Sequence, residues 1–336
     1  MKSKLAKCII FIFVTLLSFC SYNFFQSPKT VATFQSYSSP SHKIDKSLIE
    51  LSKSDDASVR KEAEKNLIRT TLTVLGYEKW QEFIDYIDIS IYTEEVLPSA
   101  SEQLIVALDL SKDLAVIVVF DAVGNEYIFH SKIEGLVPVN KIEFLSNPSY
   151  DYKMMAIYQT LDERIGGSFF EEFLEIYLYD KDEFISTWKK PLYYEEIYKE
   201  VWIDPSARED LWNKVIEETV IDFIQDHPLK INTFTTMEKH TTYSSAYPST
   251  EKFALVHRDS YKNSYYWKDA FNTFILGEVS KEVFLSNVAL LEDMENSRES
   301  LFNISNKNYK VVNSKGEVLY LPKSKFQSMF QSFLEK

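Results

Sequence analysis

The chain has 336 residues, 45% of them hydrophobic and 26% charged, which is typical of a globular protein with one large domain or two smaller ones. Its seven glycines are too few for architectures that repeat tight turns many times, such as propellers. The first 43 residues hold five lysines and no acid, so residues 44–336 carry −18 within the overall −13, and this charge excludes nucleic acid as a partner.

The first 25 residues have the layout of a secretory signal or a membrane anchor. Three lysines, Lys2, Lys4 and Lys7, precede an apolar run at 8–19, and a signal peptide has this order of basic and apolar parts. Because lysines before such a run stay on the cytoplasmic side, we expect the main domain on the extracytoplasmic face of the cell membrane. The serine-rich stretch 26–43 predicts a flexible tether.

Three fates of the leading segment stay open. It can be a cleaved signal peptide, or a retained anchor, since extension to Phe25 brings the run to about 18 residues. The third follows from Leu17-Ser18-Phe19-Cys20, which resembles the lipobox of bacterial lipoproteins, although Phe19 stands where that family has Gly, Ala or Ser. The resemblance implies lipid attachment at Cys20.

Residues 44–90 show apolar side chains at helical spacing. Asp55-Asp56 predicts the start of a helix and Gly76 its end, and a further helix is expected at 78–87. The stretch 55–63 resembles the start of the second helix of a HEAT repeat. Because nothing similar recurs one repeat length later, we expect a HEAT-like helix pair that packs on the following domain.

From about residue 100 the pattern becomes that of strands. Strands are expected at 103–110, 113–120, 126–131, 141–145, 152–159, 173–179 and 183–188, and their close spacing predicts an antiparallel meander. The unbroken apolar run at 113–120 predicts a central strand that is covered on both faces.

Residues 191–227 are predicted to be mostly helical. Apolar residues recur at helical spacing, namely Leu211, Trp212, Val215, Ile216, Val220, Ile221 and Ile224. We expect this helix to cover one face of the sheet and to end at His227-Pro228. A division of the 100–336 domain near 190–230 stays open.

The last part of the chain returns to strands. They are expected at 253–257 and 271–276, after a polar interruption at 241–250, and a hairpin is expected at 308–321 around Gly316. A final helix should follow Pro322 and bury Phe326, Met329, Phe330 and Phe333. The predicted fold class is α+β: a signal or anchor, a tether, a small helical segment, and a mainly antiparallel β domain with covering helices.

The sequence contains no motif for catalysis, nucleotides or metals. It has no G-x-S-x-G, Walker loop, G-x-G-x-x-G or H-E-x-x-H. Both cysteines, Cys8 and Cys20, lie in the leading segment, so the body has no disulfide and no thiolate ligand. We therefore predict no catalytic residue, no metal site and no cofactor.

Six aromatic residues gather between 241 and 268, interleaved with Ser, Thr, Asn and Lys. Aromatic side chains in polar loops supply rigid contact area at low entropic cost. The alternative is that each points inward from a short strand. The candidate surface for a ligand or partner consists of Tyr243, Tyr247, Tyr261, Tyr265, Tyr266 and Trp267.

Together these features predict a membrane-tethered, extracytoplasmic binding protein without catalytic activity, whose partner is an unidentified protein or cell-envelope component. Two other functions stay open. One is a carbohydrate-active hydrolase that uses a carboxylate pair near the tyrosines. Adjacent carboxylates occur in the sequence at Glu171-Glu172, Glu195-Glu196 and Glu292-Asp293. The other is a structural or regulatory module that docks through residues 44–90.

Overall fold

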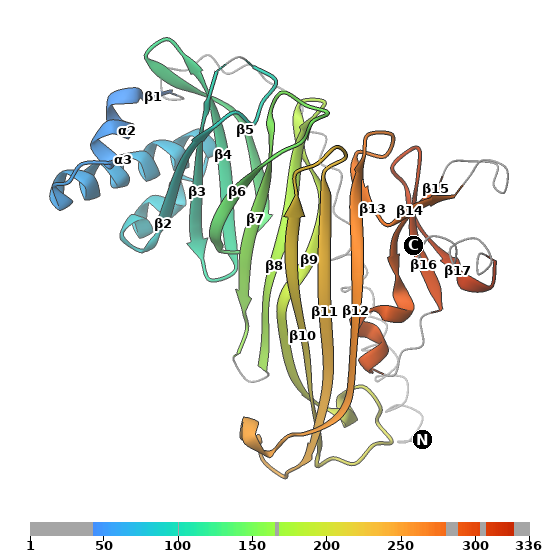
Figure 1. Ribbon diagram of the computed structural model, residues 1–336. Coiled ribbons are helices and arrows are strands. Elements are labelled where there is room, and N and C mark those ends of the chain that lie inside the picture. Colours follow the sequence, from blue (N-terminus) through green and yellow to red (C-terminus); the bar gives the residue numbers. More distant parts are fainter. Residues whose placement is uncertain (1–42, 100, 165–167, 280–287, 303–306, 326–336) are drawn as a thin grey trace, which may run out of the picture. The chain divides into compact units, whose positions relative to one another are not determined.

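The computed structural model describes residues 43–99, 101–164, 168–279, 288–302 and 307–325. The predicted signal or anchor, Cys20, nearly all of the tether and the predicted C-terminal helix therefore lie outside the described residues. The described part is mainly antiparallel β structure (Figure 1), which confirms that element of the predicted fold class. None of its helices is long and apolar enough to cross a membrane.

After a short strand, β1 (Lys43–Asp45), the next described elements are helical, as the sequence predicts. They are α2 (Lys46–Ser52), α3 (Ala57–Leu75) and a 3-10 helix, η1 (Glu78–Tyr86). The Asp56 carboxylate accepts hydrogen bonds from the backbone N–H groups of Ser58 and Val59 and so caps α3. Gly76 ends α3 with a left-handed φ of 72°, a conformation that glycine adopts without steric cost.

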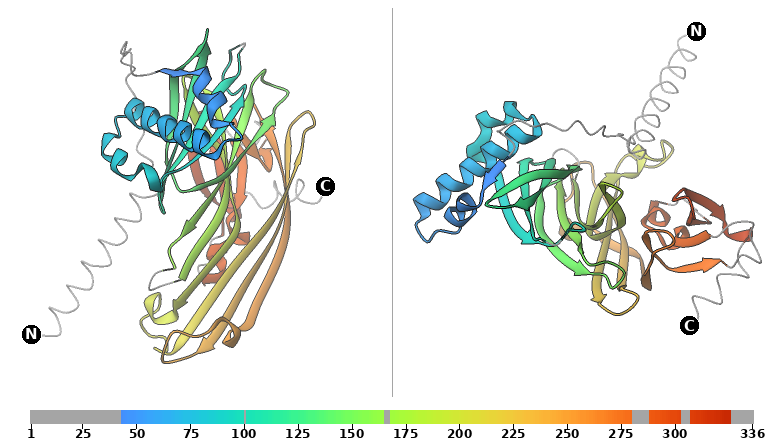
Figure 2. Two further views of the ribbon diagram at one scale, coloured as in Figure 1. Left: turned by 90° about the vertical axis from the view of Figure 1, so that its left-hand side faces the viewer. Right: turned by 90° about the horizontal axis from the view of Figure 1, so that it is seen from above.

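Sheet A is an antiparallel sheet with both faces covered. Figure 2 shows α2 and α3 against one of them. There Leu67 and Leu72 of α3 pack with Val106 of the sheet, while on the other face Ile117 packs with Ile157 of the next sheet. The prediction of a central strand covered on both faces is thus confirmed for β4. In spatial order the strands are β1 (Lys43–Asp45), β5 (Glu126–Leu136), β4 (Leu114–Val123), β3 (Gln103–Ser111) and β2 (Asp88–Glu94).

Sheet B is an eight-stranded antiparallel meander in which neighbours in sequence are neighbours in space. Residues 190–230, where we left open a division between domains, run through neighbouring strands of this one sheet. The strands are β6 (Val139–Ser146), β7 (Lys153–Asp162), β8 (Ser168–Asp180), β9 (Glu183–Lys199), β10 (Leu211–Ile224), β11 (Lys230–Tyr243), β12 (Ala254–Lys268) and β13 (Thr273–Ile275).

The predicted covering helix at 191–227 is wrong. Residues 183–199 form β9, a short 3-10 turn η2 (Glu200–Trp202) follows, and the apolar stripe belongs to β10. Val215 and Glu217 are buried whereas Glu218 and Val220 are exposed, which follows the two-residue period of a strand. The β-branched residues of β10 favour a strand, and pairing along its whole length with β11 satisfies its backbone.

Sheet C contains the predicted hairpin at 308–321, which is confirmed as β16 and β17 with Gly316 at a φ of 79° in the turn. Phe271 and Ile275 next to and within β13 pack with Ala289 and Val312 of sheet C, so the two sheets share a small core. In spatial order the strands are β14 (Gly277–Val279), β15 (Val288–Asp293), β16 (Asn308–Asn313) and β17 (Val318–Pro322). Three 3-10 turns accompany them, η4 (Met294–Asn296), η5 (Arg298–Phe302) and η6 (Lys323–Lys325).

Candidate functional site

Two loops at one end of sheet B carry exposed aromatic side chains. The first loop, 200–210, joins β9 to β10, and the second, 244–253, joins β11 to β12. Because Leu211 at the start of β10 pairs with Tyr243 at the end of β11, the two loops emerge side by side, at the bottom of Figure 1. Trp202, Trp212 and Tyr247 form what we call the aromatic surface. Tyr243 points to the opposite face of sheet B from Trp212, because Trp212 pairs with Thr242.

Trp212 lies beneath the exposed rings of the aromatic surface. Its side chain is buried, and its indole N–H donates a hydrogen bond of 3.0 Å to the Ser244 carbonyl, which ties the two loops together. Trp202 and Tyr247 pack edge-on against it, with ring centroids at 5.8 and 5.4 Å. Contacts between aromatic edges and faces are favourable, so the two outer rings are held in place although each is more than half exposed.

Two cations lie over aromatic rings at this end of sheet B. The Lys199 ammonium lies 5.1 Å from the centroid of the Trp212 ring, and the Arg208 guanidinium lies 4.6 Å from that of Tyr243. Arg208 also pairs with Asp210 at 2.8 Å, and this hydrogen bond lowers the pKa of the Asp210 carboxyl. The charge of Arg208 is therefore balanced locally by Asp210.

The structure separates the six aromatic residues that the sequence grouped. Tyr243 and Tyr247 are both exposed, and Tyr247 belongs to the aromatic surface. Tyr265 and Trp267 point inward from β12 and are buried, as the alternative interpretation expected. Four of the six lie on one strand, so their side chains alternate between its faces: Tyr261, Tyr265 and Trp267 share one face, and Tyr266 lies on the other.

The sequence interpretation missed Trp202 and Trp212. Both lie in the stretch 191–227, which the sequence predicts to be mostly helical and which forms β9, η2 and β10 instead. The signal that marks Trp202 as a loop residue is the adjacent Asp204-Pro205-Ser206, a run typical of turns. In the structure the Asp204 carboxylate accepts hydrogen bonds from the backbone and the hydroxyl of Ser206, which closes a turn rather than starting a helix.

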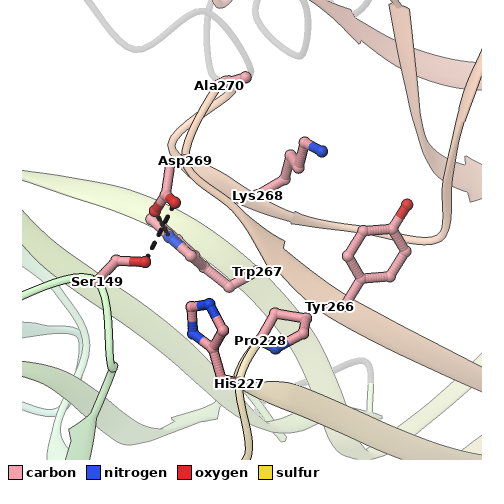
Figure 3. A pocket seen from close by; sticks show the side chains of 8 residues that line it. All are labelled: Ser149, His227, Pro228, Tyr266, Trp267, Lys268, Asp269 and Ala270. Carbon is pink, nitrogen blue, oxygen red and sulfur yellow. Dashed lines mark hydrogen bonds between the residues drawn. The ribbon is translucent and has the colours of Figure 1, made fainter.

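A cavity of about 230 Å³ near the turn between β12 and β13 brings a serine, a histidine and an aspartate together (Figure 3). The Ser149 hydroxyl donates directly to Asp269 at 3.1 Å, and the Trp267 indole N–H donates to the other oxygen of that carboxylate at 2.6 Å. In a hydrolytic triad the histidine lies between serine and carboxylate. Since His227 forms no hydrogen bond with a residue that the structure describes, these three do not form a triad.

The carboxylate pairs do not face each other as a glycosidase requires. Glu171 and Glu172 are neighbours on β8, and Glu195 and Glu196 are neighbours on β9, so the members of each pair point to opposite faces of sheet B. A second cavity, of about 200 Å³, is formed by α3, η1 and β2 and not by the tyrosine-bearing loops. Within the described ranges, no group of three or more His, Cys, Asp or Glu is placed to hold a metal ion.

Comparison of the chain with protein-family models, with characterised proteins and with solved structures found no match. No residue takes its role from a relative. The function proposed below therefore rests on the chemistry and geometry of this chain.

Proposed function

We propose that this chain is a membrane-tethered, extracytoplasmic binding protein without catalytic activity, and that its aromatic surface contacts the partner. One observation carries the proposal. Trp202 and Tyr247, together with Ile203 beside Trp202, are 47–56% exposed and gather on two adjacent loops. Contiguous exposed apolar surface on a folded protein marks interaction sites, and Trp and Tyr dominate the binding energy of protein interfaces.

The support beneath the aromatic surface favours binding. Trp212 and the hydrogen bond to Ser244 hold the loops in one arrangement, so little conformational entropy is lost when a partner binds. Tyr and Trp also stack on sugar rings as well as on protein side chains. We therefore propose a protein or a cell-envelope component as the partner.

The leading segment supports a location of the partner outside the cytoplasm. Lys2, Lys4 and Lys7 precede the apolar run at 8–19, which places the body of the chain outside the cytoplasm. The run itself, or a lipid on Cys20, anchors the chain. We propose that the tether at 26–43 then lets the aromatic surface reach a partner in the same compartment.

Photo-cross-linking of the full-length chain in its native cells tests this proposal. A photoreactive phenylalanine analogue replaces Tyr247 in one chain and Tyr86 in another, because Tyr86 of η1 is 82% exposed but stands apart from the aromatic surface. We expect a discrete cross-linked product from position 247 and none from position 86. Trp202→Ala should reduce the product at least tenfold, since an aromatic anchor contributes about 2 kcal/mol or more.

Two results would count against the aromatic surface. One is an equal yield from positions 86 and 247. The other is an undiminished yield at position 247 in the Trp202→Ala chain, with the fold shown to be intact by an unchanged unfolding midpoint.

A further inference from the structure

The turn η5 (Arg298–Phe302) inserts an arginine into the face of sheet B. The Arg298 guanidinium lies 3.2 Å from a Glu171 carboxylate oxygen and 3.8 Å from one of Glu217. It also lies 3.6 Å from the centroid of the Tyr194 ring. A planar guanidinium between carboxylates and an aromatic face is the arrangement by which proteins recognise arginine.

Two further side chains of η5 pack on the same face of sheet B, beside the arginine. Leu301 is 3% exposed and packs in a cluster that includes Val215 and Met237. The Phe302 ring stacks on that of Tyr198, with centroids 5.3 Å apart and planes 26° from parallel. The segment thus uses its first, fourth and fifth residues as anchors, as short peptides do in a binding groove.

The receiving side is built by sheet B itself. Glu171, Tyr194, Glu217 and Met237 pair successively across β8, β9, β10 and β11, so they form one row on a single face. The backbone ladder fixes this row without η5. We call Glu171, Tyr194, Tyr198 and Glu217 the arginine site.

Glu217 of the arginine site keeps an ion-pair partner when the arginine leaves. Glu217 is also paired with Lys190, at 2.7 Å between the ammonium and carboxylate, so removal of Arg298 leaves an ion pair and not an isolated buried charge. The Glu171 side chain keeps 15% of its area exposed and the Arg298 side chain keeps 29%. The arginine side chain is therefore partly exposed to solvent, and water can fill the space beside Glu171 when the arginine leaves.

Among the described residues, the backbone of η5 forms no hydrogen bond with the backbone of sheet B. Its hydrogen bonds run within its own segment, from Ser297 N–H to the Met294 carbonyl and from Ser300 N–H to the Ser297 carbonyl. The attachment therefore depends on side chains, which a peptide with the same side chains can reproduce.

We infer that the arginine site is a second binding site, distinct from the aromatic surface, for a peptide segment with arginine followed at the third and fourth positions by an aliphatic and an aromatic residue. In the isolated chain η5 occupies the site, and a partner segment of the same pattern competes with it. The net charge of −18 on residues 44–336 favours the approach of such a cationic segment.

The test uses the full-length chain in detergent and a fluorescent peptide with the sequence of residues 296–303. The Arg298→Ala/Phe302→Ala chain, which removes two anchors of η5, should bind the peptide at least tenfold more tightly than the wild type, because no segment must be displaced. A peptide with alanine in place of arginine should bind at least tenfold more weakly. Fluorescence anisotropy measures both affinities.

A second variant keeps the test decisive if the double variant does not fold. Arg298→Lys retains the cation but loses the planar fork that contacts Glu171 and stacks on Tyr194, so peptide affinity should lie between those of the wild type and the double variant. The inference is overturned if no folded variant binds more tightly than the wild type, or if the arginine-free peptide binds equally well. Trp202→Ala should leave peptide affinity unchanged, which separates this result from the function proposed above.

Discussion

At the scale of single residues, sheet B buries an ion pair between Lys190 and Glu217. Lys190 and Glu217 are 8% and 3% exposed, and a hydrogen bond of 2.7 Å joins them. Burial disfavours the Lys190 cation, but attraction by Glu217 outweighs this cost, so the pKa of Lys190 is raised above its usual value. Lys190 is therefore charged at neutral pH, and this charge depends on Glu217.

We predict that Lys190→Met lowers the free energy of unfolding by about 3 kcal/mol, because it leaves Glu217 buried without its closest cation. Urea denaturation followed by tryptophan fluorescence measures the loss. The control is Lys43→Met: Lys43 pairs with Glu126 at the same distance, but both side chains are more than 40% exposed, so the loss should be below about 1 kcal/mol. Equal losses would show that burial does not determine how much an ion pair contributes to the free energy of unfolding.

A second prediction concerns His130, a half-buried residue whose ring packs edge-on against Tyr179 at 5.4 Å between centroids. Burial lowers the pKa of His130 below its usual value, and the carboxylates of Asp121 and Asp182 oppose only part of this shift. On acidification the unfolded chain takes up this proton first. Stability from His130 is therefore fully present above a pH of about 7 and is lost as the pH falls through 6.5.

We accordingly expect the urea midpoint of the wild type to fall more between pH 7.5 and 5.5 than that of His130→Gln. Between pH 7.5 and 8.5 the two chains should respond alike. A parallel fall of both midpoints below pH 7 would remove His130 as a source of the pH dependence.

At the scale of elements, β10 shows why an apolar stripe alone does not define a helix. Seven apolar residues in this stretch fit helical spacing, and the same residues also fit a strand whose two faces are both partly apolar. Val215 is fully buried, whereas Val220 is 70% exposed. A helical stripe would bury both, so the two residues distinguish the two structures.

We predict that Val215→Asp unfolds the chain or lowers its stability by about 3 kcal/mol or more, since it buries an unpaired charge. Val220→Asp, on the same strand but on its solvent-exposed face, should change the free energy of unfolding by about 0.5 kcal/mol or less. Thermal unfolding followed by circular dichroism measures both. Similar large losses from the two substitutions would support a helix instead of β10.

At the scale of the whole molecule, shared cores join the helices and the sheets. The helices pack on sheet A, sheet A packs on sheet B through a cluster that includes Ile117 and Ile157, and sheet B shares a core with sheet C through Ile275 and Val312. Burial of both faces of sheet A accounts for the apolar content of a chain that is also strongly acidic.

A prediction at this scale concerns the anchor. If a lipid on Cys20 holds the chain at the membrane, Cys20→Ala should abolish metabolic labelling with a radioactive fatty acid and shift the chain from the membrane to the soluble fraction or leave its precursor unprocessed. Cys8→Ala removes a thiol inside the apolar run and should label like the wild type. A Cys20→Ala chain that is labelled, processed and localised like the wild type would exclude lipid attachment at this residue.

The elements that local chemistry specifies were predictable from the sequence. The cap at Asp56 and the left-handed Gly76 lie within the residues they influence, and the turn at Gly316 lies between the two strands it joins. The strand run at 103–120 was predictable too, because its β-branched and apolar residues agree with both local preference and burial. In each case the deciding interactions are close in the chain.

The candidate site was predictable only in part. Tyr243 and Tyr247 were among the predicted surface residues, but Tyr265 and Trp267 are core residues, because the alternation of β12 sends neighbouring aromatics to opposite faces. Trp202 joins the surface only because β10 pairs with β11 and thereby places the two loops side by side. Exposure depends on what packs against a side chain, and composition does not reveal it.

The sequence by itself determined the chain's acidity, the confinement of both cysteines to the leading segment, the limits of α3 and the hairpin at 308–321, because each depends on composition or on residues a few positions apart. Only the tertiary structure decided that β10 is a strand, which aromatics reach the surface, and that Arg298 meets Glu171 across 127 positions of sequence. The physical reason is that pairing between strands and burial depend on partners distant in the chain, and these override the local preferences of the residues they join.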